Sequence, residues 1–164
     1  MHALFADLLA LLQLEVEHYR KLLLLLRRER GRIVRGELAD LVDVVRRKEA
    51  VTRDLSALQV RRAAILSQLA RQGGTPGGEV SLDQAVALAP RQSAEPLRSL
   101  VTEFRNIIGR LVAANEVNRT LLGRSLDLVN GSLDTFRTLA GSGSTYGAEG
   151  RLQPVPAQAV NRTA

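Results

Sequence analysis

The chain has 164 residues, which is enough for one domain with or without a tail, and 45% of them are apolar. It contains no cysteine, which excludes disulfides and thiol chemistry, and few aromatic residues, so long helices are favoured over a core with aromatic centres. The net charge is +6, and every basic residue except Lys21 and Lys48 is an arginine, which leaves acidic proteins, acidic lipids and nucleic acid open as partners.

Residues 3–34 are predicted to form the first helix. Their apolar residues recur mostly in alternating steps of four and three, which is typical of a helix packed lengthwise on another: Phe5, Leu9, Leu12, Val16, Tyr19, Leu23, Leu26 and Ile33. The five leucines at 22–26 surround the helix, so we expect contact with two helices or with a second chain. Charged residues interrupt the segment, and we expect neither a signal peptide nor a membrane span.

A turn is predicted near Gly36, because glycine accepts the left-handed backbone that commonly ends a helix. A second helix over residues 37–72 then returns antiparallel to the first. Its apolar stripe has Lys48 and Glu49 near the seam and consists of Leu38, Leu41, Val45, Thr52, Leu55, Leu58, Ile65 and Leu69.

The glycine-rich segment 73–78 predicts a loop, and it lacks the Lys-Ser/Thr pair of a phosphate-binding loop. Residues 81–89 predict a short helix that Pro90 stops. Pro96 fits the first turn of the next helix, which we expect over 97–140.

This last long helix has the clearest heptad pattern in the chain, with Asn115 and Asn118 among its apolar columns. It would span roughly 65 Å against about 50 Å for the second helix, so part of its apolar face should stay uncovered. The composition of residues 141–164 predicts a disordered tail. The predicted fold is therefore all-α: one domain, 1–140, in which an antiparallel hairpin and a long further helix form an elongated three-helix coiled-coil bundle.

Catalytic chemistry has little support in the sequence. The two histidines, His2 and His18, make no convincing metal site without cysteine, and no nucleophile–base pairing is evident. We expect a binding protein, not an enzyme, without metal or cofactor. Asn115 and Asn118 then have two explanations: buried amides that set the register of a homomeric coiled coil, or polar positions on a face left open for a partner.

The segment "VAANEVNRTLLGRSLDLVNGSLDTF" (112–136), followed by "TYGAEGR" (145–151), resembles the FlgN-type flagellar export chaperones. Asn115, Asn118, the pair Leu121–Leu122, Asn130 and the Tyr-Gly-x-x-Gly motif at Tyr146 carry the resemblance. Looser agreement comes from Glu15 and Tyr19, the "RGE" at the turn, Lys48–Glu49, and Arg61 or Arg62.

The resemblance implies a cytoplasmic chaperone of the type III flagellar export system, which binds C-terminal helices of the hook–filament junction proteins FlgK and FlgL. It implies a client-binding face at Leu111, Asn115, Asn118, Leu121, Leu122, Ser125, Val129, Leu133 and Phe136. It also implies docking on the export gate protein FlhA through Tyr146, Gly147 and Gly150.

Two other classes stay open at this point. The heptads also fit a structural coiled-coil protein that associates with itself and has no export client. The arginines also fit an RNA or DNA binder, although stacking aromatic residues are lacking near the basic stretch, so we expect no nucleic-acid partner.

Overall fold

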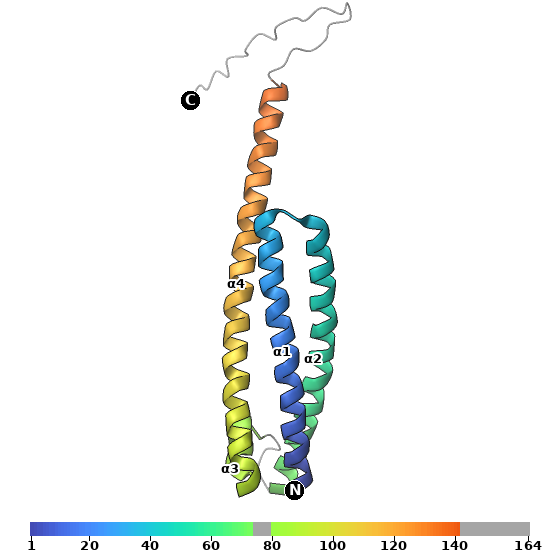
Figure 1. Ribbon diagram of the computed structural model, residues 1–164, viewed down its shortest axis with the longest axis vertical. Coiled ribbons are helices and arrows are strands. Elements are labelled where there is room, and N and C mark those ends of the chain that lie inside the picture. Colours follow the sequence, from blue (N-terminus) through green and yellow to red (C-terminus); the bar gives the residue numbers. More distant parts are fainter. Residues whose placement is uncertain (74–79, 142–164) are drawn as a thin grey trace, which may run out of the picture. The chain divides into compact units, whose positions relative to one another are not determined.

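The computed structural model describes residues 1–73 and 80–141, with the backbone alone for 139–141. Within these ranges all regular structure is helical: α1 His2–Arg35, α2 Leu38–Gly73, α3 Leu82–Leu88 and α4 Arg91–Gly141 (Figure 1). The all-α prediction, a hairpin with a long further helix, is confirmed. The chain divides into two units, 1–121 and 122–164, and the division lies inside α4. The prediction of one domain over 1–140 stays a prediction, and the tail after residue 141 lies outside the described residues.

The turn between α1 and α2 follows the prediction at Gly36. Its φ of 69° is in the left-handed region, and its N–H donates to the carbonyl of Ile33 over 3.1 Å. The next N–H, of Glu37, donates to the carbonyl of Arg32 over 3.0 Å, which completes a Schellman motif. This closure reverses the chain within two residues, so α1 and α2 run side by side in opposite directions (Figure 1).

The predicted start of the last helix is wrong by six residues. α4 begins at Arg91, and Pro96 lies inside it instead of in its first turn. The carbonyl of Pro90 accepts hydrogen bonds from the N–H groups of both Ser93 and Ala94, at 2.8 and 2.9 Å, and so opens the helix earlier. Pro96 lacks an N–H and therefore forfeits one helical hydrogen bond, which the longer helix tolerates near its beginning.

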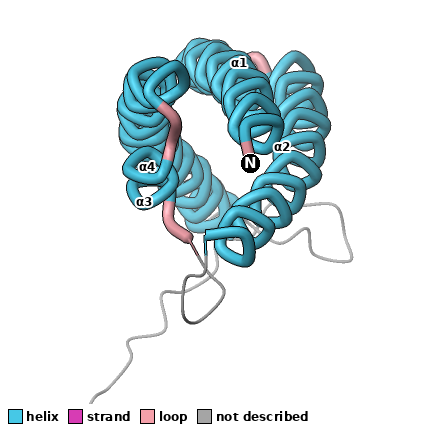
Figure 2. Tube along the Cα trace, turned by 90° about the horizontal axis from the view of Figure 1, so that it is seen from below, coloured by secondary structure: helices cyan, strands magenta, loops and turns pink. Residues whose placement is uncertain are grey.

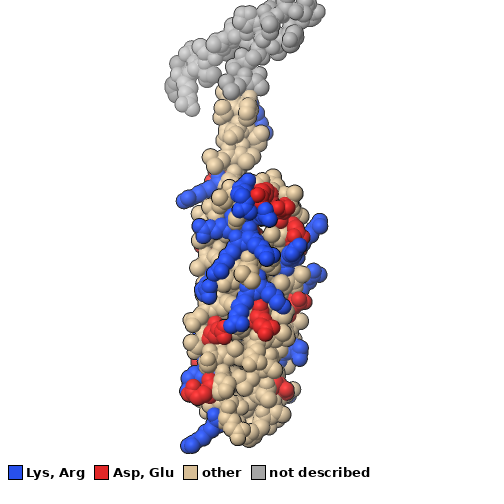
Figure 3. All heavy atoms as spheres, viewed as in Figure 1, with Lys and Arg blue, Asp and Glu red and all other residues tan. Residues whose placement is uncertain are grey.

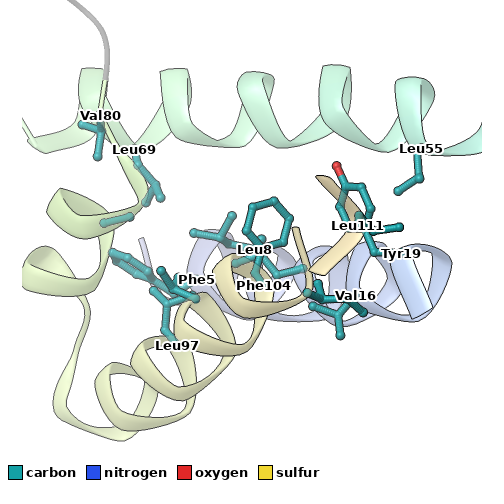
Figure 4. Packing of buried hydrophobic residues seen from close by; sticks show 14 of the residues in the cluster. Phe5, Leu8, Val16, Tyr19, Leu55, Leu69, Val80, Leu97, Phe104 and Leu111 are labelled. Atoms are coloured by element: carbon teal, nitrogen blue, oxygen red, sulfur yellow. The ribbon is translucent and has the colours of Figure 1, made fainter. Parts of the chain in front are cut away.

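The core of the first unit lies among α1, α2 and the part of α4 up to Leu111, with α1 between the other two helices (Figure 2). Figure 4 shows the side chains that fill it, with the Tyr19 hydroxyl pointing toward α2. Of the leucine run, Leu23, Leu25 and Leu26 are buried while Leu24 stays 54% exposed. Two neighbouring helices therefore cover most of the run, as predicted.

The short helix α3 closes one end of this core. The side-chain oxygen of its N-cap, Ser81, accepts from the N–H of Gln84, and the Gln84 side chain accepts from the N–H of Ser81, which is a capping box. Val80 and Ala85 are buried in the same cluster as Phe5 and Leu97. The segment 80–89 thus adds apolar cover near the beginnings of α1 and α4.

Candidate functional site

The two asparagines of the predicted site have different surroundings. Asn118 is 3% exposed, and its amide nitrogen donates to the carbonyl oxygen of Leu26 and to Oε2 of Glu29, each over 2.8 Å. Asn115 is exposed and lines a hollow beside Ile108 and Val112 on its own helix. The interpretation of both as polar positions on an open face is therefore wrong for Asn118, which α1 covers, and stays a prediction for the exposed Asn115.

Glu29 joins three helices into one polar cluster. Its side chain is 5% exposed, and Lys48 Nζ donates to its two carboxylate oxygens over 2.8 and 2.7 Å. Asn118 from α4 is the third member of this Glu29–Lys48–Asn118 cluster. Lys48 neutralises the buried charge of Glu29, and Lys48 and Asn118 both donate hydrogen bonds to its carboxylate. Pairing of this kind fixes how far α2 and α4 are shifted along α1.

A second buried carboxylate, Glu15, lies deeper in the bundle. Arg62 is its partner, and the Arg62 guanidinium also lies 5.0 Å from the centre of the Phe104 ring. The other oxygen of Glu15, Oε1, is buried without a hydrogen-bond partner among the described residues. Burial raises the pKa of Glu15 above its ordinary value of 4.5, and the positive charge of Arg62 opposes that rise only in part.

Tyr19 connects this pair to the aromatic part of the core. Its ring meets that of Phe104 edge to face, with 5.5 Å between the centroids, and its hydroxyl accepts from Gln59 Nε2 over 3.0 Å. Glu15, Tyr19 and Arg62 carried only looser agreement in the resemblance, and in the structure they form one cluster of the first unit.

Sequence reasoning missed the roles of Glu29 and of the Glu15–Arg62 pair. The signal was present in the sequence as gaps in the apolar stripes, that is, positions with the helical spacing of a stripe that a charged residue occupies. Glu29 lies at helical spacing between Leu26 and Ile33, and Arg62 lies between Leu58 and Ile65. A charged residue in such a gap indicates a buried ion pair when the facing helix has the opposite charge in a gap of its own.

The second unit presents an uncovered apolar seam on α4. All side chains from 123 to 138 are exposed. Within them a continuous four-three-four-three spacing joins the apolar residues, which we call the α4 seam: Leu122, Leu126, Val129, Leu133 and Phe136. The last four are 47–68% exposed, although side chains of this type are ordinarily buried. The predicted uncovered apolar face is present here.

Some of the other predicted site residues are buried or half-buried, and others are exposed. Leu111 is 8% exposed and belongs to the core of the first unit, and Leu121 and Leu122 are half-buried. Ser125 is exposed beside the α4 seam. Leu126, which the predicted set omitted, occupies the seam position next to it. Tyr146, Gly147 and Gly150 lie outside the described residues.

Across residues 1–73 and 80–141 there is no group of three or more His, Cys, Asp or Glu side chains that could hold a metal ion. In the same ranges no helix has the length and apolar character that crossing a membrane requires.

Comparison with protein families gives a match over nearly the whole chain. The sequence model of the family described as FlgN protein covers residues 1–154. The chain belongs to the FlgN family. FlgN proteins are flagellar export chaperones and are not known as enzymes, so membership implies a chaperone role in flagellar assembly. Comparison with curated proteins gave no match, and neither did comparison with solved structures.

Proposed function

We propose that this chain is a cytoplasmic type III export chaperone that binds the C-terminal helices of FlgK and FlgL on the α4 seam and delivers them to the export gate protein FlhA. The exposed seam is the observation that carries the proposal. A helix with an apolar stripe fits a seam of this spacing, because side chains at four-three intervals on both helices interdigitate.

Membership of the FlgN family supports the chaperone role, and the exposure of the α4 seam supports the position of the client. Leu111 and Asn118 are covered by the chain's own helices, so the proposed client contact uses Leu122, Ser125, Val129, Leu133 and Phe136. Leu121 and Asn115 stay predicted members of this set. A client helix would remove several large apolar side chains from water, each worth about 1.5–3 kcal/mol when fully buried.

The double variant Val129→Ser/Leu133→Ser tests the client site. Purified FlgK and FlgL are titrated into the full chain by calorimetry, and the variant should bind at least about tenfold more weakly, because losing 1.4 kcal/mol of binding free energy corresponds to a factor of ten. Val60→Ser/Leu38→Ser is the matched control: it removes the same two side-chain types, 70% and 73% exposed, from α2. Equal loss in both variants, or no binding of either protein to the unmodified chain, contradicts the proposal.

The proposed gate contact is tested separately. Tyr146→Ala should leave FlgK and FlgL binding unchanged and weaken binding to the cytoplasmic domain of FlhA, because one aromatic anchor can dominate a small interface. Parallel loss of client and FlhA binding contradicts the division of roles. A stable homo-oligomer in sedimentation that binds neither FlgK nor FlgL supports the self-associating coiled-coil alternative instead.

A further inference from the structure

Four arginines of the first unit line two neighbouring hollows and have no ion-pair partner among the described residues, and we call them the arginine face. Arg27, Arg28 and Arg30 follow the leucine run on α1, and Arg110 comes from α4. All four side chains are exposed. Figure 3 shows basic side chains crowded over the half of the first unit that lies nearer the α1–α2 turn. Arg32, Arg35 and Arg47, by contrast, are already neutralised through salt bridges to Glu37, Asp40 and Asp43.

Two hollows open beside the arginine face: the lining of the first is mostly charged with a few aliphatic side chains, and the lining of the second is mainly apolar. The hollow between α1 and α2 has a volume of about 560 Å³ and includes Leu24, Leu25 and Val44 in its lining. The hollow between α1 and α4 measures about 320 Å³ and includes Leu23 and Val117. Arg27 lines both, so the two hollows are neighbours on one surface.

The arginines and the aliphatic side chains beside them indicate which chemical groups a ligand of this surface should carry. A guanidinium carries five N–H donors in a planar fork that matches the two oxygens of a carboxylate. Several unpaired guanidinium groups close together repel one another, and an anionic partner relieves that repulsion. The aliphatic side chains in the linings, most of them in the hollow between α1 and α4, offer contacts for aliphatic groups of a ligand. A ligand that satisfies both needs has spaced carboxylates and aliphatic groups on one chain.

Other anions fit the same surface less well. The aromatic residues of the described first unit, Phe5, Tyr19 and Phe104, are buried, so none is available on this face to stack on nucleic-acid bases. Asp40 and Asp43 line the hollow between α1 and α2 together with the arginines. These carboxylates repel a continuous row of phosphates or an anionic bilayer, whereas a peptide can place its own carboxylates away from them.

We propose that the arginine face binds an acidic amphipathic segment of a partner protein, which lays its carboxylates on Arg27, Arg28, Arg30 and Arg110 and its aliphatic side chains in the two hollows. This surface lies in the first unit and shares no residue with the α4 seam. The proposal gives the chaperone a second docking surface, for a protein other than the client on the seam, and it does not rest on the identity of that client.

The test uses the full chain and a fluorescent synthetic helix of about 20 residues built from Glu, Leu and Ala, a length at which such a helix is stable enough to form on binding. In fluorescence anisotropy the chain should bind this peptide at least about tenfold more tightly than the same peptide with Gln at every Glu position. A Glu/Ala peptide of equal charge, without leucine, should bind more weakly because it cannot fill the hollows.

The charge-reversal variant Arg27→Glu/Arg110→Glu should weaken binding of the Glu/Leu/Ala peptide by about tenfold or more. Arg53→Glu/Arg61→Glu is the matched control, because both arginines are exposed on α2, have no ion-pair partner among the described residues and line neither hollow. It changes the net charge equally and should weaken binding by less than about threefold. Circular dichroism of both variants verifies that the helices are retained.

Three results overturn the proposal. The first is equal weakening in the two variants, which means that net charge alone attracts the peptide. The second is failure of the unmodified chain to bind the Glu/Leu/Ala peptide at all. The third is tighter binding, dependent on Arg27 and Arg110, of a single-stranded oligouridylate of similar length or of vesicles of phosphatidylserine and phosphatidylcholine, which assigns the face to nucleic acid or to a membrane.

Discussion

At the scale of single residues, the buried ion pair of Glu15 and Arg62 is a position where removing one partner should be costly. Glu15 is fully buried, so removing its partner leaves an uncompensated charge in the core. We expect Arg62→Met to lower the free energy of unfolding by about 3 kcal/mol, whereas Glu15→Gln/Arg62→Met should recover much of that loss. Chemical denaturation of the full chain measures both values. A double variant as unstable as Arg62→Met argues that lost packing on Phe104, and not the charge, is responsible.

The pH dependence of the same variant follows from the raised pKa of Glu15. The protonated form is favoured in the folded state, so the contribution of Glu15 to stability is fully present below its ordinary pKa of 4.5 and is lost as the pH rises through the folded pKa. Removing Arg62 takes away the influence that opposes this rise. The deficit of Arg62→Met relative to the unmodified chain should therefore be larger at pH 8 than near pH 5, and a deficit independent of pH contradicts this account.

The stability that Glu37 contributes at the turn should have the opposite pH dependence to that of Glu15. Hydrogen bonds from Arg35 and Arg32 lower the pKa of its carboxyl to about 2. Its stabilising effect is therefore present above pH 4.5 and is lost as the pH falls toward 2. The melting temperature of Glu37→Gln should lie below that of the unmodified chain at pH 6 and converge with it toward pH 2. Glu49→Gln, which removes an exposed carboxylate outside the turn, should differ less at pH 6; an equal difference contradicts a role for the arginine contacts.

At the scale of elements, the Glu29–Lys48–Asn118 cluster sets the register of three helices. Asn118→Ala removes the amide that donates to Leu26 and Glu29 and leaves buried acceptors with one donor fewer. We expect a loss of about 1–3 kcal/mol in the free energy of unfolding. Asn115→Ala is the matched control three residues earlier on the same helix, and because its side chain is exposed the loss should stay within about 0.5 kcal/mol. Equal losses in chemical denaturation contradict a special role for Asn118.

The elements themselves are largely predictable from the sequence, because periodic apolar stripes and Gly36 depend on local rules. Helix starts are less predictable. α4 begins six residues before the predicted start because the carbonyl of Pro90 accepts hydrogen bonds from Ser93 and Ala94, and the sequence alone does not show these bonds. The candidate site is harder still. Asn115 and Asn118 look alike in the heptad pattern, and only the position of α1 beside α4 decides which amide is buried. A polar residue at a position of an apolar stripe is a candidate for a buried polar group, but its partner lies on another helix and is not evident from the stripe itself.

At the scale of the whole molecule, the buried core and the proposed client seam belong to different parts of the chain. The buried cluster of the first unit ends at Leu111, and the partly buried residues packed on it end at Ala114. The α4 seam begins at Leu122, where the second unit begins. A chaperone benefits from this division, because an exposed helix can gain and lose a client without disturbing the packed core on which its own stability depends.

Truncation after Leu121 tests this division. The shortened chain keeps every residue of the core cluster, both buried carboxylates and Asn118, so its melting temperature should stay within a few degrees of that of the full chain. It lacks the α4 seam and should no longer bind FlgK or FlgL in calorimetry, while its affinity for the acidic Glu/Leu/Ala peptide should be unchanged. A drop of more than about 10 °C contradicts the independence of the first unit, because for a domain of this size it corresponds to a loss of a few kcal/mol. Retained binding of FlgK or FlgL by a stable truncated chain moves the client site off the seam and onto residues 1–121.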